Sequence, residues 1–137
     1  MLKSIIITAM AAFGLAIATP ASAEVSPGTI DGATTVDAAH AKALFDKGAV
    51  FIDVRKDSDW DAGRIPGAHH IELKSVYSAA TLGKAADKSA EVVVYCNGEK
   101  CLRSSKASAQ AVGWGFTKVY YFRDGMPAWE SAGFPVE

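Results

Sequence analysis

The amino-acid sequence predicts an α/β domain with a mostly parallel central sheet and helices on both faces of that sheet. Short runs of β-branched and aromatic residues alternate with segments whose apolar residues recur at helical spacing, as in repeated strand–helix–strand units. Two of these runs, 49–54 and 91–95, are apolar along most of their length, which is typical of parallel strands buried on both faces. The chain has 137 residues, of which 50% are hydrophobic and 21% charged. One domain with a sizeable core is therefore expected, and a disordered chain is excluded.

Residues 1–23 predict a secretory signal peptide rather than part of the fold. Lys3 precedes an apolar run over 5–18, and a proline then interrupts any helix. The Ala-Ser-Ala sequence at 21–23 matches the small residues before a signal-peptidase site. A membrane anchor is the alternative, but the run is shorter than the roughly 20 residues that span a bilayer. We therefore expect cleavage after Ala23 and an exported protein without membrane contact, periplasmic in a Gram-negative bacterium and otherwise secreted.

Residues 24–34 contain a proline and two glycines and show no clear period, so we expect a loose N-terminal lead-in. The domain itself is predicted over 35–137, and a short edge strand at 35–36 opens it. Asp37 is a suitable N-cap for the helix that follows, and Gly48 is a suitable residue to end that helix.

The buried strand over 49–54 leads to one or two helical turns over 57–62. Turn residues then lead to a short strand at 69–71. The next segment is the least regular of the chain. Its apolar residues predict a helix over 76–82, and a polar connection is expected over 83–89.

The strand over 91–95 is the clearest in the sequence, and Cys96 stands at its carboxyl end. A loop of six residues then leads to Arg103 and a further helix. The remaining elements are predicted as a helix over 104–112, a strand over 118–122 and a closing helix over 126–132.

Cys96 occupies a position that favours reactivity. Ligands of open α/β sheets bind beyond the carboxyl ends of the strands, and the amides of a loop and a helix start there form a cradle for anions. The same positive field favours a thiolate and lowers the pKa of a cysteine below its ordinary value of about 8.5. Cys96 is therefore predicted to be a catalytic nucleophile. The alternative is a structural cysteine or half of a disulfide.

Arg103 is predicted to bind an anionic substrate. A cation in the first turn of a helix opposes the helix dipole, and a bound anion between the two would explain it. The planar guanidinium also suits oxyanions better than a lysine would. A solvated helix residue is the alternative. The loop residues expected to line the same substrate site are Asn97, Gly98, Glu99, Lys100, Cys101 and Leu102.

Cys101 is either a resolving or regulatory thiol or an inert loop residue, because redox-active sites often keep a second cysteine nearby. Whether it forms a disulfide with Cys96 is left open by the sequence. Asp53 and Arg55 end a strand at the same edge of the sheet and are expected to form an ion pair that supports the pocket.

Metal and nucleic-acid functions are not expected. His69 and His70 are adjacent on a strand and face opposite ways, which favours structural roles, and no Cys-x-x-Cys motif occurs. The formal net charge of −1 gives no basic excess to neutralise a phosphate backbone. The oligomeric state is not predicted.

Several short segments of the sequence resemble the rhodanese family, and they follow one another in the family's order over about residues 35–137. They are FIDVR at 51–55, Trp60 with AGRIPGA at 62–68, VVVYC at 92–96, RSSKA at 103–107, GF at 115–116 with KV at 118–119, RDGMPAW at 123–129, and AGFPV at 132–136. The resemblance implies a rhodanese-like sulfurtransferase without metal or organic cofactor. In such an enzyme, Cys96 would take a sulfane sulfur from a small anionic donor such as thiosulfate. The resulting persulfide would pass the sulfur to cyanide, a small thiol or a protein thiol.

Two features depart from the family pattern. Six residues separate Cys96 from Arg103, where common sulfurtransferases have four and related phosphatases and arsenate reductases have five, and Arg64 stands where many members have histidine. A cysteine phosphatase or arsenate reductase on the same fold is therefore the enzymatic alternative, with Glu99 as the only general acid that the loop offers. The non-enzymatic alternative is a sulfur-carrier or protein-binding module.

Overall fold

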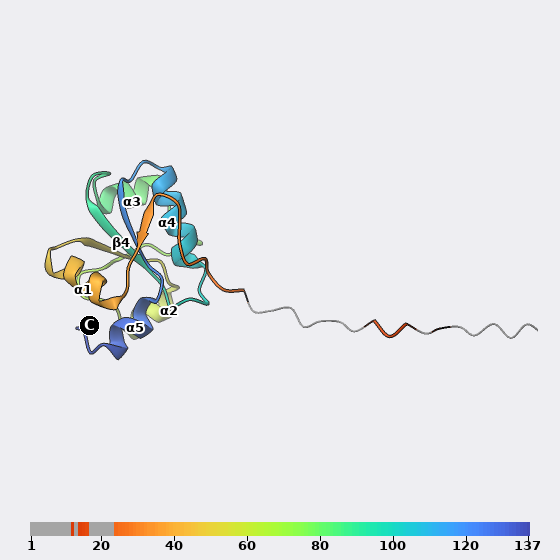
Figure 1. Ribbon diagram of the computed structural model, residues 1–137. Coiled ribbons are helices and arrows are strands. Elements are labelled where there is room, and N and C mark those ends of the chain that lie inside the picture. Colours follow the sequence, from red (N-terminus) through yellow and green to blue (C-terminus); the bar gives the residue numbers. More distant parts are fainter. Residues whose placement is uncertain (1–11, 13, 17–23) are drawn as a thin grey trace, which may run out of the picture.

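The computed structural model describes residues 12, 14–16 and 24–137 (Figure 1). The predicted signal peptide therefore lies almost entirely outside the described residues. Within the described ranges, no helix has both the length and the apolar character needed to cross a membrane.

The predicted parallel sheet is confirmed, and all five of its strands run parallel. The strands are β1 (Ala33–Thr35), β2 (Val50–Asp53), β3 (His69–His70), β4 (Glu91–Tyr95) and β5 (Lys118–Phe122). Their order across the sheet is β1-β5-β4-β2-β3, so β4 lies at the centre. Because the strands are parallel, the carboxyl ends of β2, β4 and β5 meet at one edge, and this edge positions the site.

Helices cover both faces of the sheet, as predicted (Figure 1). They are α1 (Ala38–Asp46), α2 (Asp57–Ala62), α3 (Ala79–Ala85), α4 (Arg103–Gly113) and α5 (Gly125–Ser131). The central strand supplies both cores in alternation. Val92 and Val94 pack with α3 and α4, whereas Val93 and Tyr95 pack with α1 and α5.

The core against α1 and α5 is built around Trp129, whose side chain is fully buried. Its ring lies 5.5 Å from the Phe45 ring and 5.1 Å from the Phe134 ring, both in edge-to-face geometry. Its indole Nε1 donates a hydrogen bond to the carbonyl of Pro135 at 2.7 Å. The last residues of the sequence are thereby fixed against the core.

The clearest differences from the predicted elements lie at the edge strand and in the irregular segment, whereas the strands and helices predicted with both ends elsewhere shift by at most one residue at either end. The edge strand is β1 at Ala33–Thr35 rather than 35–36, so it begins inside the predicted lead-in. The irregular segment forms a helix later than expected, because Ser78 and Thr81 make a reciprocal capping box that starts α3 at Ala79. This helix continues through Gly83 to Ala85, where a polar connection was predicted.

Candidate active site

Cys96 directly follows β4, and its side chain is fully buried. Its carbonyl oxygen accepts a hydrogen bond of 2.9 Å from the amide of Met126, so the first turn of α5 fixes its backbone. The first residue of this helix is Gly125, at φ +59°. A Cβ atom there would collide with the carbonyl oxygen of Cys96 and lie only 3.0 Å from the amide nitrogen of Gly98. Only glycine fits at this position.

Cys96 and Cys101 are joined by a disulfide, with 6.3 Å between their Cα atoms. The structure therefore answers the question that the sequence left open. The amide of Cys101 donates to the carbonyl of Gly98 at 3.0 Å, and Gly98 has a φ of +112°, so a tight turn folds the loop back toward Cys96. In this oxidised form neither sulfur is a nucleophile, and catalysis by Cys96 requires reduction of the bond.

The N-terminal lead-in is fixed to the same loop, which corrects the expectation that it is loose. The amide and the hydroxyl of Ser26 both donate to the carbonyl of Glu99, at 2.7 and 2.6 Å. Arg123, just after β5, donates to the carbonyl of Ser26 at 2.7 Å and lies 3.6 Å from the carboxylate of Glu99. Ser26 is only 3% exposed. The lead-in therefore packs against the loop between the two cysteines and holds it in place.

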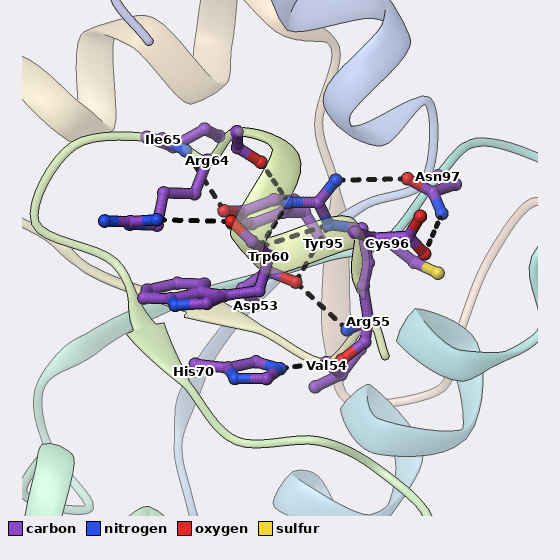
Figure 2. Close-up of polar contacts among 12 residues, drawn as sticks. Asp53, Val54, Arg55, Trp60, Arg64, Ile65, His70, Tyr95, Cys96 and Asn97 are labelled. Atoms are coloured by element: carbon purple, nitrogen blue, oxygen red, sulfur yellow. Dashed lines mark hydrogen bonds and ion pairs between the residues drawn. The ribbon is translucent and has the colours of Figure 1, made fainter. Parts of the chain in front are cut away.

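Asp53 and Arg55 form the predicted ion pair, at 2.7 Å in a buried position. Burial alone would lower the pKa of Arg55, but the hydrogen bond and charge of Asp53, together with smaller effects of neighbouring charges, outweigh burial and raise that pKa. Arg55 also donates to the side-chain oxygen of Asn97 at 3.3 Å, and Figure 2 shows it between Asp53 and Asn97, beside Cys96. The side-chain nitrogen of Asn97, Nδ2, donates to the carboxylate of Asp59 at 2.8 Å. The residue after Cys96 is thus held from two sides.

Arg103 begins α4, and its guanidinium is engaged within the protein. It donates to the carbonyl of Val54 at 3.1 Å and forms an ion pair with the carboxylate of Glu72. Sequence reasoning missed Glu72, because it lies in the least regular segment. Hydrogen bonds from Arg103 and then from Ser75 outweigh burial and lower the pKa of Glu72 from 4.5 to about 2. Contact of Arg103 with a substrate stays a prediction, and Glu72 would share the guanidinium with it.

From the Arg103–Glu72 ion pair we expect a specific loss of folding stability in acid. Because folding lowers the pKa of Glu72, its contribution is complete above about pH 4.5 and is lost as the pH falls toward 2. The expected loss is about 3 kcal/mol at most. In urea unfolding at stepped pH values, Glu72→Gln should lack this pH-dependent part. Asp46→Asn is the control, because the exposed Lys42–Asp46 pair should contribute little. Equal pH slopes for wild type and Glu72→Gln would contradict the role of the pair.

The other predicted loop residues lie between these fixed points. Glu99 and Lys100 are exposed, and Leu102 is the N-cap residue of α4. Among the residues that the structure describes, no side chain caps this helix start. An anion at this helix start would therefore not compete with a side-chain cap, and the predicted anion cradle stays a prediction.

Aromatic and cationic side chains form a stack beside α2. The rings of Trp60 and His70 are stacked at 4.8 Å, and the guanidinium of Arg64 lies 4.5 Å from the centre of the Trp60 ring (Figure 2). His70 also shares a hydrogen bond of 2.8 Å with the carbonyl of Arg55. In the described part of the chain, no three His, Cys, Asp or Glu side chains are grouped as metal ligands.

Comparison with known proteins places this geometry in context. Residues 37–132 match the family described as Rhodanese-like domain. The chain is 36% identical over 99 residues to the thiosulfate sulfurtransferase GlpE of Pseudomonas fluorescens (strain SBW25), a match that covers 72% of this chain and 84% of that protein.

Solved structures are similar as well. A crystal structure of the Alr3790 protein from Anabaena superposes with a TM-score of 0.65 and 27% identity, over 74% of this chain and 90% of that one. The protein RPA3614 from Rhodopseudomonas palustris, described as a possible tyrosine phosphatase, has a TM-score of 0.60 and 29% identity, over 77% and 85% of the two chains.

Proposed function

Because the chain belongs to the rhodanese family, we propose that it transfers sulfane sulfur from a thiosulfate-like donor through a persulfide on Cys96. The observation that carries this proposal is the place of Cys96. It lies at the carboxyl end of the central strand and is followed by a short loop and the start of α4. No side chain of the described residues caps this helix start. This is the arrangement that activates a thiolate and holds an anion beside it.

The reaction has two steps once the Cys96–Cys101 bond is reduced. The Cys96 thiolate attacks the outer sulfur of thiosulfate, the sulfur–sulfur bond of the donor breaks, and sulfite leaves with the electron pair. An acceptor such as cyanide or a thiol then attacks the outer sulfur of the persulfide and expels the Cys96 thiolate. We infer that the first-turn amides of α4 hold the anionic donor.

Arg103 is proposed to assist in binding the donor. Arg103→Lys keeps the positive charge beside Glu72 but loses the planar fork. We expect a lower kcat/KM for thiosulfate with the fold intact by circular dichroism. An unchanged kcat/KM would assign Arg103 to anchoring α4 alone.

Intact-mass spectrometry of the reduced Cys101→Ser variant, which keeps Cys96 but has no second thiol beside it, tests the proposed function. Thiosulfate should add the mass of one sulfur atom, and cyanide should remove it as thiocyanate. A phosphatase would instead hydrolyse a phosphate ester such as p-nitrophenyl phosphate, which the structural similarity to RPA3614 makes the alternative to exclude. Phosphate-ester hydrolysis needs a general acid to protonate the leaving oxygen. The loop offers only the carboxylate of Glu99 for this role, and that carboxylate forms an ion pair of 3.6 Å with the guanidinium of Arg123. Ester turnover without a persulfide would overturn the proposal.

We also propose that the protein is exported. The sequence pattern of 1–23 supports this, and so does the Cys96–Cys101 disulfide, because disulfides form and persist in oxidising compartments. Protein recovered from the cell envelope should begin at Glu24 on N-terminal sequencing, whereas Met1 retained in a membrane fraction would contradict cleavage and favour an anchored protein.

A further inference from the structure

The loop between the two cysteines is held by contacts that do not involve sulfur. Asn97, directly after Cys96, is bound by Arg55 and Asp59. Two residues further on, the carbonyl of Glu99 is bound by Ser26. None of these contacts is made by a sulfur atom, so reduction of the disulfide removes none of their donors or acceptors. The conformation that brings the two sulfur atoms within bonding distance is therefore built into the loop.

The two cysteines differ in their access to solvent. The side chain of Cys96 is fully buried, whereas Cys101 is partly exposed. An external acceptor has to reach a buried sulfur atom, while Cys101 already stands beside it. Reactions between groups held in position are strongly favoured over bimolecular ones. A persulfide on Cys96 would therefore meet the thiolate of Cys101 before it meets an acceptor from solution.

We propose that Cys101 is the internal acceptor of this enzyme and that sulfide is its product. The proposal rests on the proposed function, because it begins from the Cys96 persulfide. The thiolate of Cys101 attacks the inner sulfur, the Sγ atom of Cys96. The bond between this atom and the outer sulfur breaks, and the outer sulfur leaves as hydrosulfide with the electron pair. The product on the protein is the Cys96–Cys101 disulfide present in the structure.

The electrons balance through an external dithiol, either a small dithiol or a pair of cysteines on another protein. One thiolate attacks the partly exposed sulfur of Cys101, which expels the Cys96 thiolate, the nucleophile needed for the next turnover. The second thiol then resolves the mixed disulfide and restores the thiol of Cys101. In total, thiosulfate and a dithiol give sulfite, hydrogen sulfide and the oxidised dithiol. The sulfane sulfur is reduced, and the dithiol is oxidised.

A single-turnover experiment tests this inference. The full chain is reduced with a dithiol, freed of it by anaerobic desalting, and mixed with equimolar thiosulfate. The wild type should release both sulfite and sulfide in amounts equal to the protein. Its mass should fall by two hydrogen atoms relative to the reduced chain. Cys101→Ser and Cys101→Ala should release sulfite but no sulfide, and should gain the mass of one sulfur atom, which cyanide then removes.

The outcomes separate this inference from the proposed function. A wild type that keeps the added sulfur and releases no sulfide overturns the role of Cys101 and leaves the persulfide on Cys96 in place. Sulfide release without formation of the disulfide overturns it as well. If the Cys101 variants, folded by circular dichroism, release no sulfite, then Cys96 alone is not the sulfur acceptor and the proposed function fails with its extension.

Discussion

Replacing Cys96 with serine should lower sulfur transfer from thiosulfate to cyanide by roughly a thousand-fold or more, to the level of the uncatalysed reaction. A serine hydroxyl is not ionised near neutral pH and forms no persulfide, so the first step of the reaction is lost. Serine is nearly isosteric with cysteine and should fit the fully buried position after β4, so the fold should stay intact. The measurements are thiocyanate formation and the intact mass after incubation with thiosulfate.

Cys101→Ser is the matched control for this substitution, because both variants lose the disulfide. With cyanide as external acceptor, Cys101→Ser should keep transferring sulfur without a dithiol, whereas the wild type needs a dithiol to reopen the Cys96–Cys101 bond. Wild type should lose activity under an oxidant and regain it with a dithiol, whereas Cys101→Ser should show no such recoverable loss. An inactive Cys101→Ser beside an active Cys96→Ser would reverse the assignment of the nucleophile.

Gly125→Ala should damage both the fold and the site. The added Cβ collides with the carbonyl oxygen of Cys96, and the φ of +59° is strained for any residue with a side chain. We expect a loss of about 2–4 kcal/mol in the free energy of unfolding. Sulfur transfer should fall as well, because relief of the collision displaces the Cys96 backbone. Urea unfolding and the thiocyanate assay measure the two effects.

Gly133→Ala separates the collision from the backbone strain. Gly133 has a comparable φ of +74°, but apart from its own chain neighbours no atom of the described residues lies within 4 Å of a Cβ added there. Its substitution should cost only about 1 kcal/mol and leave sulfur transfer unchanged. If Gly125→Ala is no more damaging than Gly133→Ala, the close approach to Cys96 is not what requires the glycine.

Local patterns in the sequence predicted the elements whose causes are local. The strands β4 and β5 have the predicted bounds, because their β-branched and aromatic runs have no competing period. The side chain of Asp37 accepts from the amide of His40 at 2.8 Å and caps α1 as expected. The helix α3 begins later than the predicted 76–82, because that range includes Tyr77 among the apolar residues of the helix. Tyr77 instead precedes the helix, and its hydroxyl donates to the carbonyl of Ala107 in α4.

The site was predicted where its partners are close in sequence. Asp53 and Arg55 are two residues apart, and their ion pair follows from the strand that they end. The missed contacts join distant segments. Glu72 lies 31 residues from Arg103, and Ser26 lies 73 residues from Glu99. Such partners are set by how the elements pack, and neither spacing nor periodicity along a single sequence encodes them.

The contacts at residues 26 and 137 have a practical consequence for protein engineering. A segment attached before Ser26 starts beside the loop of the two cysteines. One attached after Glu137 starts beside Arg64, whose backbone pairs with that residue and whose side chain stacks on Trp60. Affinity tags and fluorescent fusions at either position therefore crowd the site. The exposed turn at Gly48 precedes β2 at the opposite edge of the sheet, and an inserted label there leaves the site clear.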